Sequence, residues 1–118
     1  MNKDVINTLL RVNDNLIIPN YLIKFLDKFD LQNNELIMLV YVLNFKEEII
    51  FDVDKFSKEL YVSHNDILEN VNSLAEKNYI SIEISKNNGI IEEYISLDLF
   101  YSKINSFLIE SEKKDNSS

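Results

Sequence analysis

One histidine, His64, is the first candidate for acid–base chemistry in a sequence of 118 residues that contains no cysteine. Imidazole changes charge near neutral pH, and it acts as a general base when other side chains orient it. The spacing of the serines and carboxylates around His64 does not identify a catalytic triad. We therefore expect His64 to be an exposed surface residue and the protein not to be an enzyme.

Two pairs of adjacent acids, Glu47-Glu48 and Glu92-Glu93, raise the question of a cation site, because carboxylate oxygens are ligands for Ca²⁺ and Mg²⁺. Adjacent residues on a strand point to opposite faces, so Glu92 and Glu93 cannot readily share one ion. Both pairs are expected to be solvated. The absence of cysteine excludes disulfides and thiolate metal sites, and a single glycine cannot build a glycine-rich phosphate loop. We expect no metal and no cofactor.

Hydrophobic periodicity predicts helices in the first half of the chain. Residues 1–15 are an N-terminal extension with a short helical stripe, and residues 16–18 should be extended because they precede Pro19. Apolar side chains at spacings of three and four predict a helix of about three turns. They are Leu22, Phe25, Leu26 and Phe29. Asn33 can cap the next helix, where residues 36–43 are apolar on every side, so this helix should be central or covered by a partner.

The second half of the chain combines helices with a β-hairpin. Residues 49–51 are a short strand candidate, and a helix of about two turns follows at 53–60. Ser63, with Asp66 three residues later, approximates a capping box for a helix that runs to about residue 77.

Residues 79–84 alternate with a period of two, and 85–89 are typical of a turn before a second strand at 90–95. Ser96 can cap a last helix with a wide apolar stripe.

This order of elements is that of a winged helix, an α+β fold that is mainly α. The helix-turn-helix occupies residues 54–77, the β-hairpin wing occupies 79–95, and an extra C-terminal helix follows. We expect an N-terminal extension at 1–15, the winged-helix domain at 16–109, and a polar tail or linker start at 110–118.

The order and spacing of several segments carry a family resemblance. The segments are IPNYLI at 18–23, DLQNNELIML at 30–39, VS at 62–63, LAEKNYI at 74–80 and GIIEEYISL at 89–97. Together they resemble the amino-terminal domain of DnaD-like replication initiation proteins of low-GC Gram-positive bacteria. The resemblance covers roughly residues 16–104.

The resemblance implies a winged-helix module that self-associates into dimers or tetramers. It implies a scaffold role in primosome assembly, upstream of helicase loading, with replication initiation proteins as partners. In such proteins a separate carboxy-terminal domain contributes much of the DNA binding, and nothing like that domain is present in these 118 residues. The resemblance therefore implies DNA binding that is weak or that belongs to a missing C-terminal domain.

The charges argue against DNA reading by the second helix of the motif. The whole sequence holds 12 Lys plus Arg against 20 Asp plus Glu, a net charge of −8. The side of this helix that we expect to be exposed carries Asn65, Asp66, Glu69, Asn70, Asn72, Ser73 and Glu76. Phosphate neutralisation supplies most non-specific affinity for duplex DNA, so we expect this face to be solvated.

A DNA-binding transcription regulator is the alternative interpretation. It predicts salt-dependent duplex binding through the polar side chains of the helix and the wing tip. The candidate contacts are Asn65, Asn72, Lys86 and Asn87.

Apolar side chains exceed what one small core needs in residues 16–18, in 36–43 and in the last helix. Excess apolar surface usually marks a partner site. The alternative is that the last helix packs across the first two helices and completes the core. With the family resemblance, we expect self-association through residues beside the hairpin and the last helix. They are Ile17, Ile18, Tyr94, Leu97, Phe100 and Ile104.

The longest uninterrupted apolar run, residues 36–43, is far shorter than the roughly twenty residues that a membrane span needs. The N-terminal residues show neither a signal peptide nor a transit peptide. We therefore expect a cytoplasmic protein.

Overall fold

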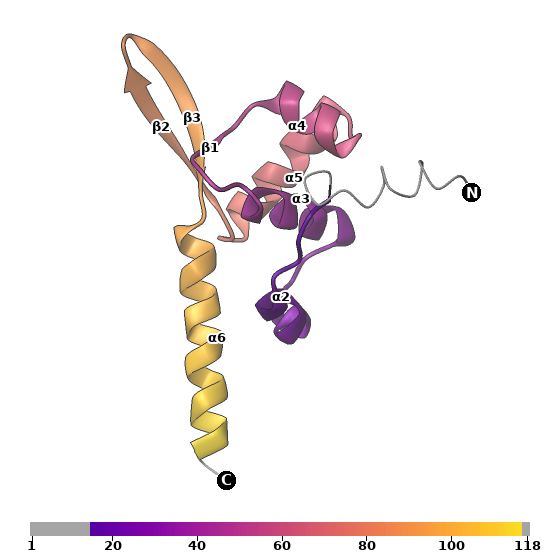
Figure 1. The fold of residues 1–118 in the computed structure, drawn as a ribbon, viewed down its shortest axis with the longest axis vertical. Helices are drawn as coiled ribbons and strands as arrows, with labels where there is room; N and C mark the ends of the chain where they lie inside the picture. The colour runs from indigo at the N-terminus through magenta and orange to yellow at the C-terminus, as the bar shows by residue number, and fades with distance from the viewer. Residues whose placement is uncertain (1–14, 117–118) are drawn as a thin grey trace, which may run out of the picture.

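The computed structural model describes residues 15–116, with side chains to residue 113. Figure 1 shows the order of the elements. They are α2 (Asn20–Lys24), the 3₁₀ helix η2 (Leu26–Lys28), α3 (Asn33–Leu43), β1 (Ile49–Ile50), α4 (Val53–Leu60), α5 (His64–Glu76), β2 (Ser81–Asn87), β3 (Ile90–Ser96) and α6 (Asp98–Asn116). This mainly helical arrangement with a small antiparallel sheet confirms the predicted winged-helix class. The helical stripe predicted within residues 1–15 runs from Val5 to Val12 and lies outside the described residues.

Helices α4 and α5 form the helix-turn-helix, and side chains cap both of them. Asp52 accepts a hydrogen bond from the Lys55 amide at 3.1 Å, and Ser63 accepts one from the Asp66 amide at 3.1 Å. The cap predicted at Ser63 is confirmed. The cap predicted at Asn33 is wrong by one residue, because α3 begins after Gln32.

The first predicted helix is shorter than expected. Its pattern spans α2 and η2, and the two are separated at Phe25, whose φ of −107° and ψ of 17° are not helical. Phe25 and Phe29 on either side of η2 are both buried, and their rings lie 5.5 Å and 5.9 Å from the Phe107 ring of α6. The periodicity correctly identified Phe25 and Phe29 as buried. It did not show that the helix is interrupted at Phe25, where these side chains pack against α6.

The wing is a three-stranded antiparallel sheet in the order β1-β3-β2. Asn87 pairs with Ile90, so the turn consists of Asn88 and Gly89 alone, with φ values of 52° and 79°. Positive φ at both positions is what a two-residue type I′ turn requires. Strand β2 therefore continues through residues 85–87, which were predicted to belong to a five-residue turn.

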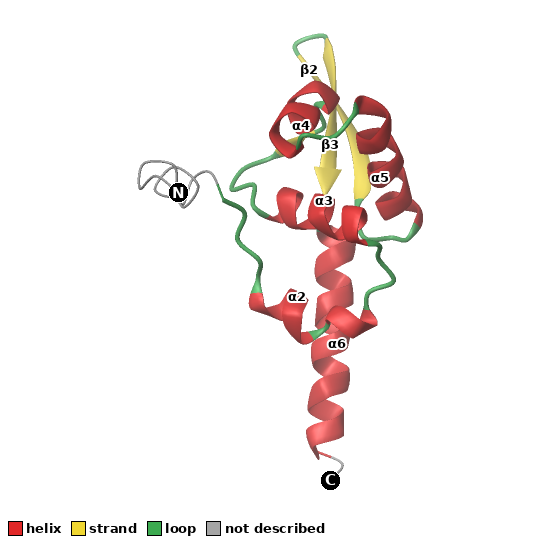
Figure 2. Ribbon diagram, turned by 90° about the vertical axis from the view of Figure 1, so that its right-hand side faces the viewer, coloured by secondary structure: helices red, strands yellow, loops and turns green. Residues whose placement is uncertain are grey.

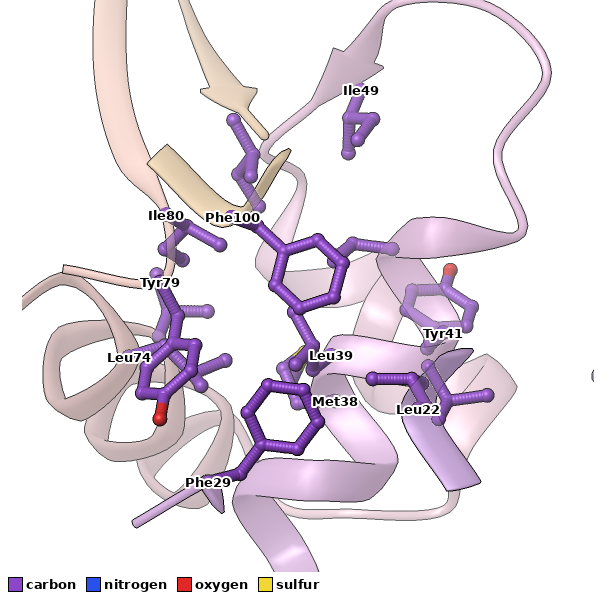
Figure 3. Close-up of a cluster of buried hydrophobic side chains, with 14 of the residues drawn as sticks. Leu22, Phe29, Met38, Leu39, Tyr41, Ile49, Leu74, Tyr79, Ile80 and Phe100 are labelled. Atoms are coloured by element: carbon purple, nitrogen blue, oxygen red, sulfur yellow. The ribbon is translucent and has the colours of Figure 1, made fainter. Parts of the chain in front are cut away.

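The core lies where α3, α5, the base of the sheet and α6 meet (Figure 3). Phe100 of α6 is fully buried, and its ring lies 6.1 Å from Phe29 and 5.9 Å from Tyr21. The apolar stripe of α6 thus completes the core, as one of the two interpretations held. The wing and α6 leave the base of the sheet in opposite directions (Figures 1 and 2). Helix α6 continues to Asn116, through most of the segment predicted as a polar tail.

Candidate interaction surfaces

An open apolar groove of about 290 Å³ lies beside α2 and α3. All of its lining side chains are apolar: Leu16, Ile18, Leu22, Ile23, Leu26, Leu36, Ile37 and Val40. Several of them are exposed, among them Ile23 at 63% and Ile37 at 54%. Apolar side chains gathered on one surface of a small domain indicate a partner site more strongly than the same side chains scattered singly. We call this surface the α2–α3 groove.

One asparagine holds the extended segment that forms one wall of the groove. The Asn44 side-chain oxygen accepts a hydrogen bond from the Ile17 amide at 2.8 Å, and its nitrogen donates to the Ile17 carbonyl at 2.9 Å. The same nitrogen donates to the Val40 carbonyl in α3 at 2.6 Å. Side chains alternate along an extended segment. Leu16 and Ile18 therefore line the groove, while Ile17 points elsewhere and is 64% exposed.

A polar network joins α5 to the start of α3, and Glu35 is at its centre with 4% of its surface exposed. Its Oε1 accepts hydrogen bonds from the Gln32 amide at 2.9 Å and from Lys77 Nζ at 3.1 Å. Its Oε2 accepts one from the Ser73 hydroxyl at 2.5 Å. Burial raises the pKa of Glu35, but the hydrogen bonds from Ser73, Gln32 and Lys77 outweigh it, so the pKa lies below its ordinary value.

Two α5 residues expected on its exposed face belong to this contact with α3 instead. Asn70 is buried and accepts a hydrogen bond from the Asn34 side chain at 2.8 Å, and Ser73 is half-buried against Glu35. Periodicity alone could not show this, because α5 is polar on both flanks of its apolar stripe. Only the position of α3 decides which flank is covered.

The remaining exposed face of α5 is acidic. Asp66, Glu69 and Glu76 are exposed together with Asn65 and Asn72. Lys77, at the C-cap, is the one lysine or arginine of this helix and its caps. Its ammonium group pairs with Glu35 and donates a hydrogen bond to the Asp30 carbonyl. Lys86 and Asn87 are exposed at the far end of β2, beside the wing turn. The four candidate DNA contacts are therefore accessible, and only Lys86 brings a positive charge.

His64 is exposed, as expected, and lies against a single carboxylate. Its Nε2 is 3.4 Å from Asp54 Oδ1, and Asp54 also pairs with Lys58 at 3.0 Å. The pKa of Asp54 is lowered chiefly by Lys58 and to a smaller extent by His64. Within the described residues, no group of three or more His, Cys, Asp or Glu side chains could hold a metal ion.

The family model described as the DnaD N-terminal domain matches residues 18–116. The chain belongs to the DnaD N-terminal domain family. The match begins inside the extended segment of the α2–α3 groove and ends with α6, so it covers every helix and strand described above. It confirms the resemblance seen in the sequence. No curated protein sequence matches the chain.

The six residues predicted for self-association do not form one surface in this DnaD N-terminal domain. Ile18 lines the α2–α3 groove, and Ile17 is exposed beside it. Phe100 and Ile104 are buried in the core, at 0% and 7% exposure. Tyr94 and Leu97 are half-buried and line a polar cleft along the wing, where the lining also includes Glu83, Ser85 and Asn87, apart from the groove.

Sequence reasoning missed the groove residues Ile23, Leu26 and Ile37. One signal was present, because residues 36–43 are apolar on every side and Ile37 is the member left exposed. Among the described residues, no helix is long and apolar enough to cross a membrane.

Proposed function

We propose that this DnaD N-terminal domain acts in the cytoplasm as a non-catalytic assembly module of DNA replication initiation. In this role it self-associates and binds other initiation proteins during primosome assembly. Family membership links the chain to DNA replication. The assembly role is supported by the α2–α3 groove, which is apolar, open and built from side chains that the core leaves exposed.

The groove suits a second copy of the chain as its occupant. A fully buried Ile or Leu side chain contributes about 1.5–3 kcal/mol relative to an exposed one, and a micromolar complex requires about 8 kcal/mol. Ile18, Ile23 and Ile37 are 55%, 63% and 54% exposed, so burying the remaining surface of all three in both copies would supply much of that free energy. Asn44 fixes the backbone of the extended segment before association, so little further ordering is needed there.

Light scattering of the purified domain at tens of micromolar tests this proposal. We expect a dimer or a larger assembly for the natural sequence, and a shift towards monomer for Ile37→Asp, which introduces a charge into the groove. Leu68→Asp is the matched control, because Leu68 is similarly exposed on α5 but lies outside the groove. A strict monomer for the natural sequence would overturn the proposal.

A further inference from the structure

Strand β2 forms the outer edge of the wing. The sheet order is β1-β3-β2, so β2 pairs with β3 on one side only within the described residues (Figure 1). An exposed strand edge presents unpaired amide and carbonyl groups that can accept another strand. The edge of β2 contains no proline, and it is paired regularly along its full length, Ser81–Asn87.

The two-residue turn determines which backbone groups of β2 face outward. In a type I′ hairpin, the residues that flank the turn exchange both of their hydrogen bonds, so Asn87 is bonded to Ile90. Hydrogen-bonded and non-hydrogen-bonded pairs then alternate along the ladder. Three residues of β2 consequently turn their amide and carbonyl groups towards the open edge. They are Ile82, Ile84 and Lys86.

The side chains of these three residues lie on one face of the sheet, and this face packs against the core at the base of the wing. Ile82 pairs with Ile95, which is buried, and the next residue on this face, Ile84, is 72% exposed. Ile91 of β3 lies diagonally from Ile84 on the same face and is 67% exposed. Beyond the core this face therefore carries two exposed apolar side chains, Ile84 and Ile91, beside the charged residues Glu93 and Lys86 that pair with them.

We propose that the edge of β2 pairs antiparallel with β2 of a second copy, about a two-fold axis through Ile84. Ile84 then faces the partner's Ile84, and both exposed side chains become partly buried. Glu83 faces the partner's Ser85, and Lys86 faces the partner's Ile82, so no like charges are opposed. All three outward-facing residues of β2 lie within the paired stretch, where each exchanges hydrogen bonds with the partner.

Other registers are less favourable. An axis through Lys86 would oppose two lysines, and an axis through Glu83 would oppose two glutamates. An axis through Ser85 would place Ile82 opposite residue 88 of the turn, so only Ile84 and Lys86 would exchange hydrogen bonds with the partner. An axis through Ile82 would carry the pairing into residue 80, which precedes β2 and is buried. The charges and the ladder together select Ile84.

This contact is separate from the α2–α3 groove and does not rest on the proposed function. The groove is formed by residues 16–40, whereas the wing edge lies at residues 81–87. Two different two-fold contacts on one chain join dimers into a tetramer or a longer assembly. The wing contact forms a dimer by itself, and it leads to such larger assemblies only in combination with the groove contact.

Disulfide formation in Ile84→Cys tests the pairing, because the natural chain contains no cysteine. Directly opposed, hydrogen-bonded residues have Cα atoms about 5.5 Å apart, within the range that a disulfide spans. We expect a cross-linked dimer under mild oxidation. Association raises the local thiol concentration towards millimolar, so the reaction should be about tenfold or more faster than random collision at tens of micromolar.

Ile91→Cys is the matched control, because it is equally exposed on the same face but its strand lies on the far side of β2 from the partner. Equal cross-linking rates for the two variants would overturn the proposal. The Ile84→Cys reaction is repeated with Ile37→Asp in the same chain. Cross-linking that persists there supports a wing contact independent of the groove. Cross-linking that disappears shows that the wing has no such contact of its own.

Discussion

Glu35 shows how one buried charge can organise two helices. It accepts hydrogen bonds from the backbone of Gln32, from Ser73 and from Lys77, so it caps α3 and fixes the C-terminal end of α5. Each of these donors also reduces the free-energy cost of keeping a carboxylate away from water. Glu35 lies in the first turn of α3, three residues after Gln32, and this spacing is visible in the sequence. Its distant partners Ser73 and Lys77 are known only from the fold.

Glu35→Gln should lower the free energy of unfolding by about 1–3 kcal/mol at neutral pH, because it removes charged hydrogen bonds and leaves Lys77 without its carboxylate. Urea unfolding followed by circular dichroism measures this change. Glu69→Gln, an exposed acid on α5, is the control and should change stability by less than about 0.5 kcal/mol. An equal loss in both variants would mean that the network contributes nothing specific.

The same substitution should flatten the dependence of stability on acid pH. The pKa of Glu35 is lower in the folded state than its ordinary value of 4.5, so the unfolded chain takes up the proton first as the pH falls. Stability from Glu35 is therefore present above that ordinary pKa and is lost as the pH falls through the folded-state pKa. Between about pH 6 and pH 3, Glu35→Gln should lose less stability than the natural chain. If both proteins lost the same stability over this pH range, the lowered pKa of Glu35 in the folded state would be contradicted.

Among the elements, those governed by local chemistry were predicted well from the sequence. Ser63 caps α5 by accepting a hydrogen bond from the amide of Asp66, three residues later, as predicted. The hairpin turn was placed correctly at Gly89, but it was predicted with five residues and has two. The elements decided by distant contacts were predicted less well. Phe25 breaks the first helix where its ring meets α6, and Phe100 could be assigned to the core or to an interface until its neighbours were known.

Gly89→Ala should destabilise the wing by about 1–2 kcal/mol through backbone strain. Gly89 has a φ of +79°, and a Cβ atom there would meet no other atom within 4 Å, so no steric clash contributes. Amide hydrogen exchange in β2 and β3 should become faster by a factor of about 5–30 while α3 is unaffected. Asn88→Gly is the control, since glycine readily adopts its φ of 52°. Unchanged amide exchange rates in Gly89→Ala would show that the positive φ at this position does not limit the stability of the wing.

Asn44→Ala should release the extended segment from α3 and weaken self-association. The change removes both hydrogen bonds to Ile17 and the one to Val40, each with a net contribution of about 0.5–1.5 kcal/mol. We expect the dimer dissociation constant from sedimentation to rise about tenfold, because the groove wall must then be ordered on binding. Asn72→Ala on the exposed face of α5 should leave the constant unchanged. Equal dissociation constants for the natural chain, Asn44→Ala and Asn72→Ala would show that the extended segment has no part in self-association.

At the scale of the whole molecule, the charge distribution favours the proposed assembly role over the alternative of a DNA-binding regulator. The net charge of −8 is not spread evenly, since the exposed face of α5 carries Asp66, Glu69 and Glu76 while Lys77 is held by Glu35. The shape that places a helix in the major groove is present, but the charges on that helix repel phosphate. This charge distribution supports the proposal that the winged helix binds protein through its groove and its strand edge.

The domain should accordingly show no salt-dependent binding to duplex DNA at affinities near the usual non-specific range of about 10⁻⁴–10⁻⁶ M. Replacing Glu69 and Glu76 together with lysine adds two charges per substitution and changes the net charge from −8 to −4. Because the helix and wing remain in place, this double variant should gain binding that weakens as salt is added. Fluorescence anisotropy with a labelled duplex at low salt measures both proteins. Micromolar, salt-sensitive binding by the natural chain would favour a DNA-binding regulator, and it would require Asn65, Asn72, Lys86 and Asn87 to overcome the acidic face.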